Sequence, residues 1–331
     1  MTFAPFSITG IGSMPHREPS DACKLILEHF DIPFWPQLPK LSVRESMIVQ
    51  FSEGFPGFTL DADKAFVKKN EEEIYTWLSN YTEETLEPVS EKYSSGLYSL
   101  SEALQDQKIP VIKGQITGPL TFTLSLKDEE GRLIYFDETL RELSLLHLKA
   151  KVKWQINFLK KLADEVIIFV DEPILQAVGT SAYISVEQTE AMRLVRELVH
   201  FIKSNGAKAG IHCCGRADWK EVMSSGIDIL SFDAFFFFDF LKIYIEQIEE
   251  FLKNGGFIAW GFIPTTDDIY SLSDDQIIKS ALSKISEISK QIPLIKTNSL
   301  ITPSCGMGSL ELSAAQRVCY LLRLLKNLLN E

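Results

Sequence analysis

The sequence predicts an α/β protein built as a single (β/α)8 TIM barrel, with residues 1–331 forming one domain. Short apolar runs alternate with longer amphipathic stretches along the chain, which is the pattern of strands that are each followed by a helix. The number of runs favours a closed barrel, although periodicity alone leaves an open doubly wound sheet as the alternative. The predicted strands cover Phe6–Ile11, Phe34–Leu38, Val111–Ile116, Glu165–Val170, Ala207–Cys213, Ile227–Phe232, Gly256–Gly261 and Leu300–Ser304.

Several stretches between these strands have apolar residues at helical spacing. The longest irregular passage, residues 51–90, separates the second and third predicted strands. We interpret it as an insertion after strand 2 that contains a hairpin and a surface helix, because loops of this length in compact domains are often binding loops or lids. The predicted helices cover Ser20–Phe30, Leu133–Ala163, Ser185–Ser204 and Ser309–Leu329.

Composition excludes several classes of protein. The net charge of -12 and the lack of a basic tract argue against a nucleic-acid partner. No apolar run is long enough to span a membrane, and the first residues do not have the pattern of a secretory signal. Five cysteines in a chain of 331 residues do not indicate a disulfide framework. We therefore expect a cytoplasmic protein whose cysteines serve packing, metal binding or catalysis.

The segment Ala209–Arg216 has the sequence Ala-Gly-Ile-His-Cys-Cys-Gly-Arg and places chemically active groups at the end of a predicted strand. Side chains two residues apart on a strand point the same way, so His212 and Cys214 converge and Cys213 faces the opposite side. Cys305 follows the last predicted strand. An imidazole and two thiolates are typical ligands of zinc, and our hypothesis is that these three side chains bind it. Two further cysteines, Cys23 and Cys319, lie on apolar helix faces and are expected in the core.

Carboxylates follow two other predicted strands. Asp171 and Glu172 interrupt the apolar run that precedes them, where an unpaired charge would be costly. They form either a salt bridge at the barrel rim or a binding site for a substrate ammonium, and we take Asp171 as the candidate catalytic carboxylate. Asp233 follows the sixth strand and is expected to be either an oxygen ligand of zinc or a partner of His212.

Five segments occur in a characteristic order along the chain: Ile11-Gly-Ser13, Thr117-Gly-Pro119, Val170-Asp-Glu-Pro173, His212-x-Cys214 and Pro303-Ser-Cys305. In this order they resemble the C-terminal catalytic barrel of cobalamin-independent methionine synthase, and the resemblance covers nearly the whole chain. The passage from His212 to Asp233 also resembles the zinc methyltransferases that act with corrinoid proteins. Those enzymes and uroporphyrinogen decarboxylase share the same barrel superfamily.

The resemblance implies a zinc enzyme that transfers a methyl group to the thiol of homocysteine. Zinc would be held by the histidine and two cysteines already named, with Asp233 at the position of a glutamate ligand of the family. Homocysteine would be bound by Ile11, Ser13 and Asp171. A family glutamate that contacts this substrate falls near Leu41, where Glu45 is the available substitute.

The methyl donor implied by the sequence is a methylcorrinoid, carried by a partner protein. The family's proton-donating histidine falls near Ile263, where the segment Trp260-Gly-Phe-Ile-Pro264 contains no histidine. A folate donor needs protonation of its leaving nitrogen, whereas a corrinoid leaving group does not. Two alternatives remain open: a zinc methyltransferase with another thiol acceptor such as coenzyme M, and an enzyme similar to uroporphyrinogen decarboxylase.

Overall fold

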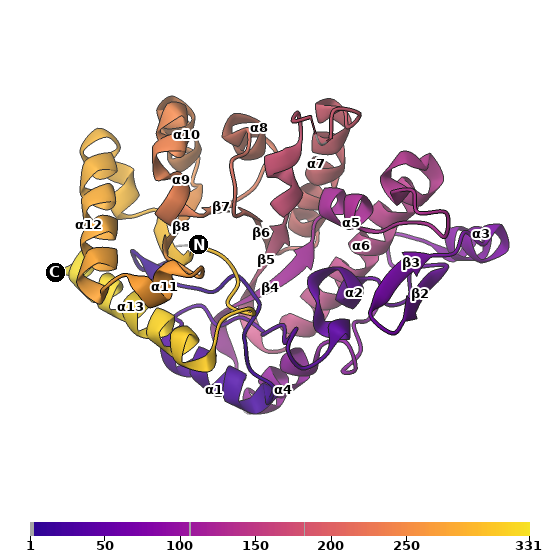
Figure 1. The fold of residues 1–331 in the computed structure, drawn as a ribbon, viewed down its shortest axis with the longest axis horizontal. Helices are drawn as coiled ribbons and strands as arrows, with labels where there is room; N and C mark the ends of the chain where they lie inside the picture. The colour runs from indigo at the N-terminus through magenta and orange to yellow at the C-terminus, as the bar shows by residue number, and fades with distance from the viewer. Residues whose placement is uncertain (1–2, 106, 182) are drawn as a thin grey trace.

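A curled parallel sheet forms the centre of the computed structural model, which describes residues 3–105, 107–181 and 183–331. Within these residues the sheet has seven strands in the order β1-β9-β8-β7-β6-β5-β4 (Figure 1). A separate antiparallel hairpin joins β2 to β3. The strands are β1 (Ser7–Ile8), β2 (Phe58–Asp61), β3 (Lys64–Val67), β4 (Ile109–Thr117), β5 (Ala163–Asp171), β6 (Lys208–Cys213), β7 (Ile229–Phe232), β8 (Phe257–Ile263) and β9 (Ser299–Pro303).

The predicted strand at Phe34–Leu38 is not confirmed. This part of the chain lies between the two edges of the sheet, where isolated bridges pair Ile32 with Thr9, directly after β1, and Phe34 with Lys113 of β4. Pro33 and Pro36 interrupt the segment, and a proline has no backbone N–H to donate to a strand ladder. The segment therefore takes the place of a strand between β1 and β4 without forming a continuous one, and eight strands are not established.

Helices cover the outside of the curled sheet (Figure 1). The expected helix at Leu133–Ala163 is shorter than predicted, because the Asp137 side chain caps its start by accepting a hydrogen bond from Leu140 N. In the described part of the chain, no helix has the length and apolar character needed to cross a membrane. The helices are α1 (Pro19–His29), α2 (Met47–Phe51), α3 (Glu71–Asn80), α4 (Ser95–Ala103), α5 (Pro119–Ser125), α6 (Glu138–Leu159), α7 (Gln188–Ser204), α8 (Trp219–Ser224), α9 (Ala234–Leu241), α10 (Ile245–Lys253), α11 (Asp268–Ser271), α12 (Asp274–Gln291) and α13 (Leu312–Asn330).

The buried apolar residues form two separate clusters. The larger one lies between the sheet and its helices and includes Cys23, Cys213 and Cys319, as expected for cysteines that only pack. The smaller one is enclosed by the sheet, because its members come from the Ile32 segment and from β5, β7, β8 and β9. They are Ile32, Ile167, Phe169, Ile229, Ala259 and Leu300. An apolar floor on the inner side of the curled sheet is what a barrel-like arrangement requires.

Residues 51–90 contain both the hairpin and the surface helix that the sequence predicts, as β2–β3 and α3. Buried polar side chains of α6 hold this segment. His147 Nε2 lies 2.9 Å from the carbonyl oxygen of Phe51, and Lys151 Nζ donates to the carbonyl of Pro88 at 3.0 Å. The segment is therefore attached to the outer side of α6 through its backbone.

The buried His147 gives a testable pH dependence. Burial, with a smaller effect of the Lys151 charge, holds the pKa of His147 well below its ordinary value of 6.5. Below that pH the unfolded chain binds a proton that the folded chain does not, so acidification must weaken folding. We expect wild-type stability to fall by up to about 1.4 kcal/mol more per pH unit below pH 6.5 than that of His147→Gln.

Chemical denaturation at a series of pH values measures this difference. The exposed His200 on α7 supplies the control, and His200→Gln should follow the wild type. Parallel pH dependences for wild type and His147→Gln would show that the imidazole titrates normally in the folded protein.

Candidate functional site

A cavity of about 320 Å³ lies where the loops after β1, β5, β6 and β9 meet. The carboxyl ends of parallel strands meet at one face of a barrel-like sheet, which is where such proteins bind their ligands. Most of the side chains that the sequence singles out line this cavity. They are Ile11, Ser13, Glu45, Asp171, His212, Cys214 and Cys305.

Strand register brings three of the polar side chains into one row. The Cα atom of Asp171 on β5 pairs with that of His212 on β6, and His212 in turn pairs with Ser231 on β7. Cys214 follows β6 directly, on the same side as His212. Cys213, between them, is fully buried in the outer core, as the alternation of strand side chains predicts.

His212, Cys214 and Cys305 form a cluster of possible metal ligands. One ligand atom from each lies within 4.8 Å of the other two. A tetrahedral zinc ion with bonds of about 2.0–2.3 Å spaces its ligand atoms about 3.5–4 Å apart, so small side-chain rotations would suffice. The three residues therefore fit a zinc ion by both type and spacing.

The hydrogen bonds of His212 favour metal binding through one particular nitrogen. Nδ1 lies 3.0 Å from Ser231 Oγ. When Nδ1 carries the proton and donates it to the serine, Nε2 presents a lone pair. Nε2 is buried and has no hydrogen-bond partner among the described residues. An unpartnered buried nitrogen beside two thiols is the environment that a metal ion would complete.

The two cysteines of the cluster are electrostatically linked. A hydrogen bond with the Cys305 thiol, supported by His212, lowers the pKa of Cys214 to about 4 despite its burial. The same hydrogen bond, together with burial, raises the pKa of Cys305. One thiolate is thus already favoured in the protein, and a cation would favour ionisation of the second.

Asp233 lies outside the three-residue cluster. Its Oδ1 accepts a hydrogen bond from Phe236 N at 2.9 Å, so this carboxylate caps α9. Burial raises the pKa of Asp233 to about 6, and the nearby Cys214 contributes to the rise. The geometry places this residue near the ligands but gives its carboxylate a different hydrogen-bonding task.

The loops after β1 and β9 pack tightly against each other beside Cys305. Ser13 Oγ accepts a hydrogen bond from Gly308 N at 3.1 Å, and the Ser13 carbonyl accepts one from Met307 N at 2.9 Å. A Cβ atom at Gly306 would lie 2.2 Å from Ser13 Oγ, so a larger residue directly after Cys305 would displace the Ser13 hydroxyl from its bond to Gly308. This contact fixes Ser13 next to the cluster formed by His212, Cys214 and Cys305, which we call the metal-type cluster.

Asp171 supplies an available carboxylate oxygen. Its Oδ1 is buried and has no partner among the described residues. Burial raises the pKa of Asp171 to about 6, although the charges of Lys113 and His212 act in the opposite direction. A carboxylate in this situation is well suited to accept hydrogen bonds from a cationic group of a ligand.

Glu172, by contrast, does not line the cavity, and its carboxylate is fully engaged elsewhere. It accepts hydrogen bonds from Leu120 N at 2.9 Å, Thr121 N at 2.8 Å and Thr121 Oγ1 at 2.6 Å at the start of α5. Burial raises its pKa to about 7. Glu172 therefore ties the end of β5 to α5.

Glu45 reaches the cavity wall, but both of its carboxylate oxygens also have partners. Oε2 accepts from Leu38 N at 2.9 Å, and Oε1 accepts from Ser95 N at 3.1 Å and from the Ser95 hydroxyl. Burial raises the pKa of Glu45. The side chain thus joins the cavity wall at Glu45 to the segment around Leu38 and to the start of α4.

Sequence reasoning missed two residues that support the site. Ser231, the partner of His212, could have been found because it shares a strand face with Ile229 and precedes Asp233 by two residues. Lys113 lies in a run of alternating polar residues, Lys113, Gln115 and Thr117, within an otherwise apolar strand. That alternation is the signal of a polar inner face.

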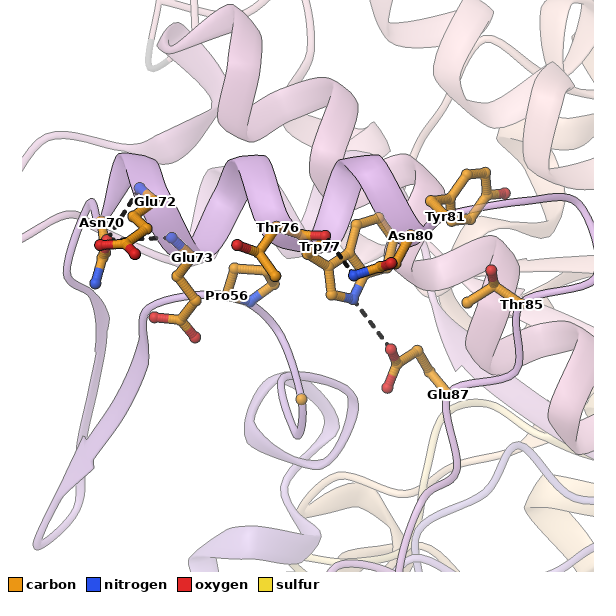
Figure 2. A pocket seen from close by; sticks show the side chains of 11 residues that line it. Pro56, Asn70, Glu72, Glu73, Thr76, Trp77, Asn80, Tyr81, Thr85 and Glu87 are labelled. Carbon is orange, nitrogen blue, oxygen red and sulfur yellow. Dashed lines mark hydrogen bonds between the residues drawn. The ribbon is translucent and has the colours of Figure 1, made fainter.

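A second cavity, of about 550 Å³, lies beside α3 and shares no lining residue with the first (Figure 2). The ring of Trp77 stacks on that of Tyr81, with centroids 5.2 Å apart, and its Nε1 donates to Glu87 Oε1 at 3.0 Å. No residue predicted to bind metal or substrate lines this cavity. We therefore restrict the candidate site to the first one.

Comparison with known proteins gives matches in structure only. No protein-family model matches the chain, and no curated protein matches its sequence. A B12-independent methionine synthase from a Shewanella species, solved in complex with selenomethionine, aligns with a TM-score of 0.62 and 16% identity over 99% of this chain and 100% of that one. A methyltransferase from Methanosarcina mazei aligns with a TM-score of 0.59 and 13% identity over 99% and 94% of the two chains. At these identities the likenesses show a common fold.

The hydrogen bond between Ser231 and His212 predicts an indirect effect on metal affinity. Because Ser231→Ala removes the acceptor that orients the imidazole, we expect zinc affinity to fall by about 10–100-fold. Competition with a chromophoric chelator measures this change. Ser144→Ala is the matched control, since Ser144 is equally buried and its hydroxyl donates to the carbonyl of Leu140 within α6, away from the cluster. Equal affinities for both variants would contradict the role of Ser231.

Proposed function

We propose that this protein is a zinc-dependent methyltransferase that methylates the thiol sulfur of homocysteine and forms methionine. The observation that carries the proposal is the meeting of His212, Cys214 and Cys305 in the cavity that Ser13 and Asp171 also line. The two structural neighbours described as a methionine synthase and a methyltransferase have the same fold and support this choice of reaction.

Zinc is the metal that best matches these ligands. Thiolate and imidazole donors select zinc over magnesium or calcium, and three protein ligands leave one position open to a substrate. When bound, zinc would lower the pKa of an incoming thiol so that its sulfur reacts as a thiolate. The chain itself supplies a hydrogen-bond partner for His212 Nδ1 in Ser231, which leaves Nε2 free to bind a metal when Nδ1 carries the proton, and a lowered pKa at Cys214.

The amino-acid end of homocysteine would bind beside the cluster, against the residues of β5 and of the loop after β1. The free Oδ1 of Asp171 would accept a hydrogen bond from the substrate ammonium, and Ile11 and Ser13 would contact the same end. Glu45 would shape the wall, because both of its oxygens already have partners. Glu172 would act indirectly, by fixing the end of β5 that carries Asp171.

The methyl donor we propose is a methylcorrinoid bound to a partner protein. The end of β8 supports it, because Ile263 is buried and Pro264 follows, so no imidazole is available there to protonate a folate. A decarboxylase acting on a porphyrinogen is disfavoured, since no arginine is among the described residues that line the cavity and its substrate carries several carboxylates.

Removal of one thiol tests the metal centre. We expect the wild type to bind about one zinc per chain and Cys305→Ser to lose most of it, because two ligands seldom retain zinc. Methionine formation from methylcobalamin should fall with the zinc content. Cys319→Ala, which alters a buried cysteine of α13, should keep both properties.

Metal analysis and product formation are measured on the same preparations, with methyltetrahydrofolate as a second donor. Undiminished methionine formation by zinc-free protein would rule the proposal out. Activity with the folate alone would reject the corrinoid donor and leave the zinc reaction intact.

Substitution of Asp171 tests which thiol accepts the methyl group. Asp171→Asn removes a charge-assisted hydrogen bond to an ammonium, so we expect KM for homocysteine to rise about 10–100-fold. Coenzyme M has no ammonium, and its KM should change little. Steady-state kinetics with both thiols measure this selectivity. If the wild type prefers coenzyme M to homocysteine, coenzyme M becomes the proposed acceptor in place of homocysteine.

A further inference from the structure

Lys113 is a charged residue on the inner side of β4, and no step above uses it. Its side chain is fully buried, and it does not line the cavity. Nζ donates hydrogen bonds to the carbonyl oxygen of Ile11 at 2.6 Å and to Gln115 Oε1 at 3.2 Å. It also lies 4.6 Å from the ring centroid of Phe169 and 5.6 Å from that of Phe34. Burial lowers the pKa of Lys113 to about 7, although the charge of Asp171 acts in the opposite direction. Burial of this group is costly, so such specific partners indicate a defined task.

The partners of Lys113 connect it to one wall of the cavity. Ile11 itself lines the cavity, as does Ser13 two residues later. Gln115 supports the residue between them, because a Cβ atom at Gly12 would lie 3.1 Å from Gln115 Cδ. Gln115 Nε2 donates in turn to the carbonyl of Trp35 at 3.0 Å. The buried hydrogen bonds of Lys113 and Gln115 thus hold the backbone that follows β1 in place.

Lys113 has no corresponding link to the metal-type cluster. Its two hydrogen bonds go to the loop after β1 and to its own strand, whereas the orientation of His212 depends on Ser231 of β7. Toward that side, the charge of Lys113 acts on Asp171, and Ser13 accepts hydrogen bonds from Met307 N and Gly308 N of the loop after Cys305. These contacts involve the backbone after Cys305 and not the ligand atoms themselves, so loss of Lys113 should disturb the wall more than the cluster.

We propose that Lys113 is a positioning residue that sets the wall formed by Ile11 and Ser13, so that binding of the amino-acid end of the substrate depends on it and binding of the sulfur does not. This inference rests on the proposed function. It divides substrate recognition into two parts with separate supports, a metal-side part held by Ser231 and an amino-acid part held by Lys113.

Two ligands separate these parts experimentally. Methionine has the amino-acid end and no thiol, whereas propane-1-thiol has a thiol and no amino-acid end. For Lys113→Met, we expect the zinc-loaded protein to bind methionine about tenfold or more weakly, since a hydrogen bond from a charged donor is lost. Affinity for propane-1-thiol and the zinc content should remain within about twofold of the wild type. Titration calorimetry and metal analysis give these quantities.

Lys151→Met is the matched control. Lys151 is the other fully buried lysine among the described residues, and it donates to the carbonyl of Pro88 outside the sheet. This variant should bind both ligands as the wild type does. Lys113→Gln, which keeps a hydrogen-bond donor, provides a second variant if Lys113→Met does not fold, and methionine binding should again be weakened selectively.

Three outcomes would overturn the inference. Equal losses for methionine and propane-1-thiol, or loss of zinc, would show a general structural role for Lys113. Unchanged methionine affinity would show that the wall does not depend on it. A wild type that binds neither zinc nor methionine would overturn the proposed function and this inference together, whereas the first two results would leave the proposed function standing.

Discussion

The register of β5, β6 and β7 sets Asp171, His212 and Ser231 side by side, because parallel strands pair with their Cα atoms in fixed rows. The whole candidate site depends on this row. A shift of β6 by one residue would turn His212 toward the outer helices and direct Cys213 inward. The candidate metal ligand His212 would then no longer lie beside Ser231 and Asp171, although every residue would still be present.

Burial of polar groups around the cavity has a cost in the free energy of folding. Glu172 and Glu45 are nearly or fully buried, and each is retained by several hydrogen bonds from backbone N–H groups and hydroxyls. Asp171 and His212 differ, because each keeps one buried atom without a partner among the described residues. The satisfied carboxylates therefore maintain the shape of the site, whereas the unsatisfied atoms are the ones available to a ligand.

Local rules were sufficient for part of this site. Alternation along a strand predicted that His212 and Cys214 face the same way and that Cys213 does not. The approach of Cys305 could only be proposed, since strand order across a sheet depends on contacts distant in sequence. Alternation also implies that Glu172 faces away from Asp171, but its partners, the N–H groups of α5, come from a segment distant in sequence and were beyond local rules.

The fold, like the site, could be predicted from the sequence only in part. Apolar runs located β4 to β9 within a few residues, since buried parallel strands are continuous apolar segments. The run at Phe34–Leu38 looked equally apolar, but its two flanking or internal prolines, Pro33 and Pro36, left only isolated bridges. The support that Lys113 gives to Ile11 joins residues far apart in the chain, and no spacing rule would have found it.

Because β1 pairs with β9, the chain must bring its beginning and its end together before the loops around Ser13 and Cys305 can interlock. During synthesis on the ribosome, His212 and Cys214 emerge long before Cys305. A nascent chain therefore lacks one member of the candidate cluster until β9 and the residues that follow it have been synthesised. Binding of a metal ion to this cluster would then occur late and would stabilise the complete fold relative to partly synthesised chains.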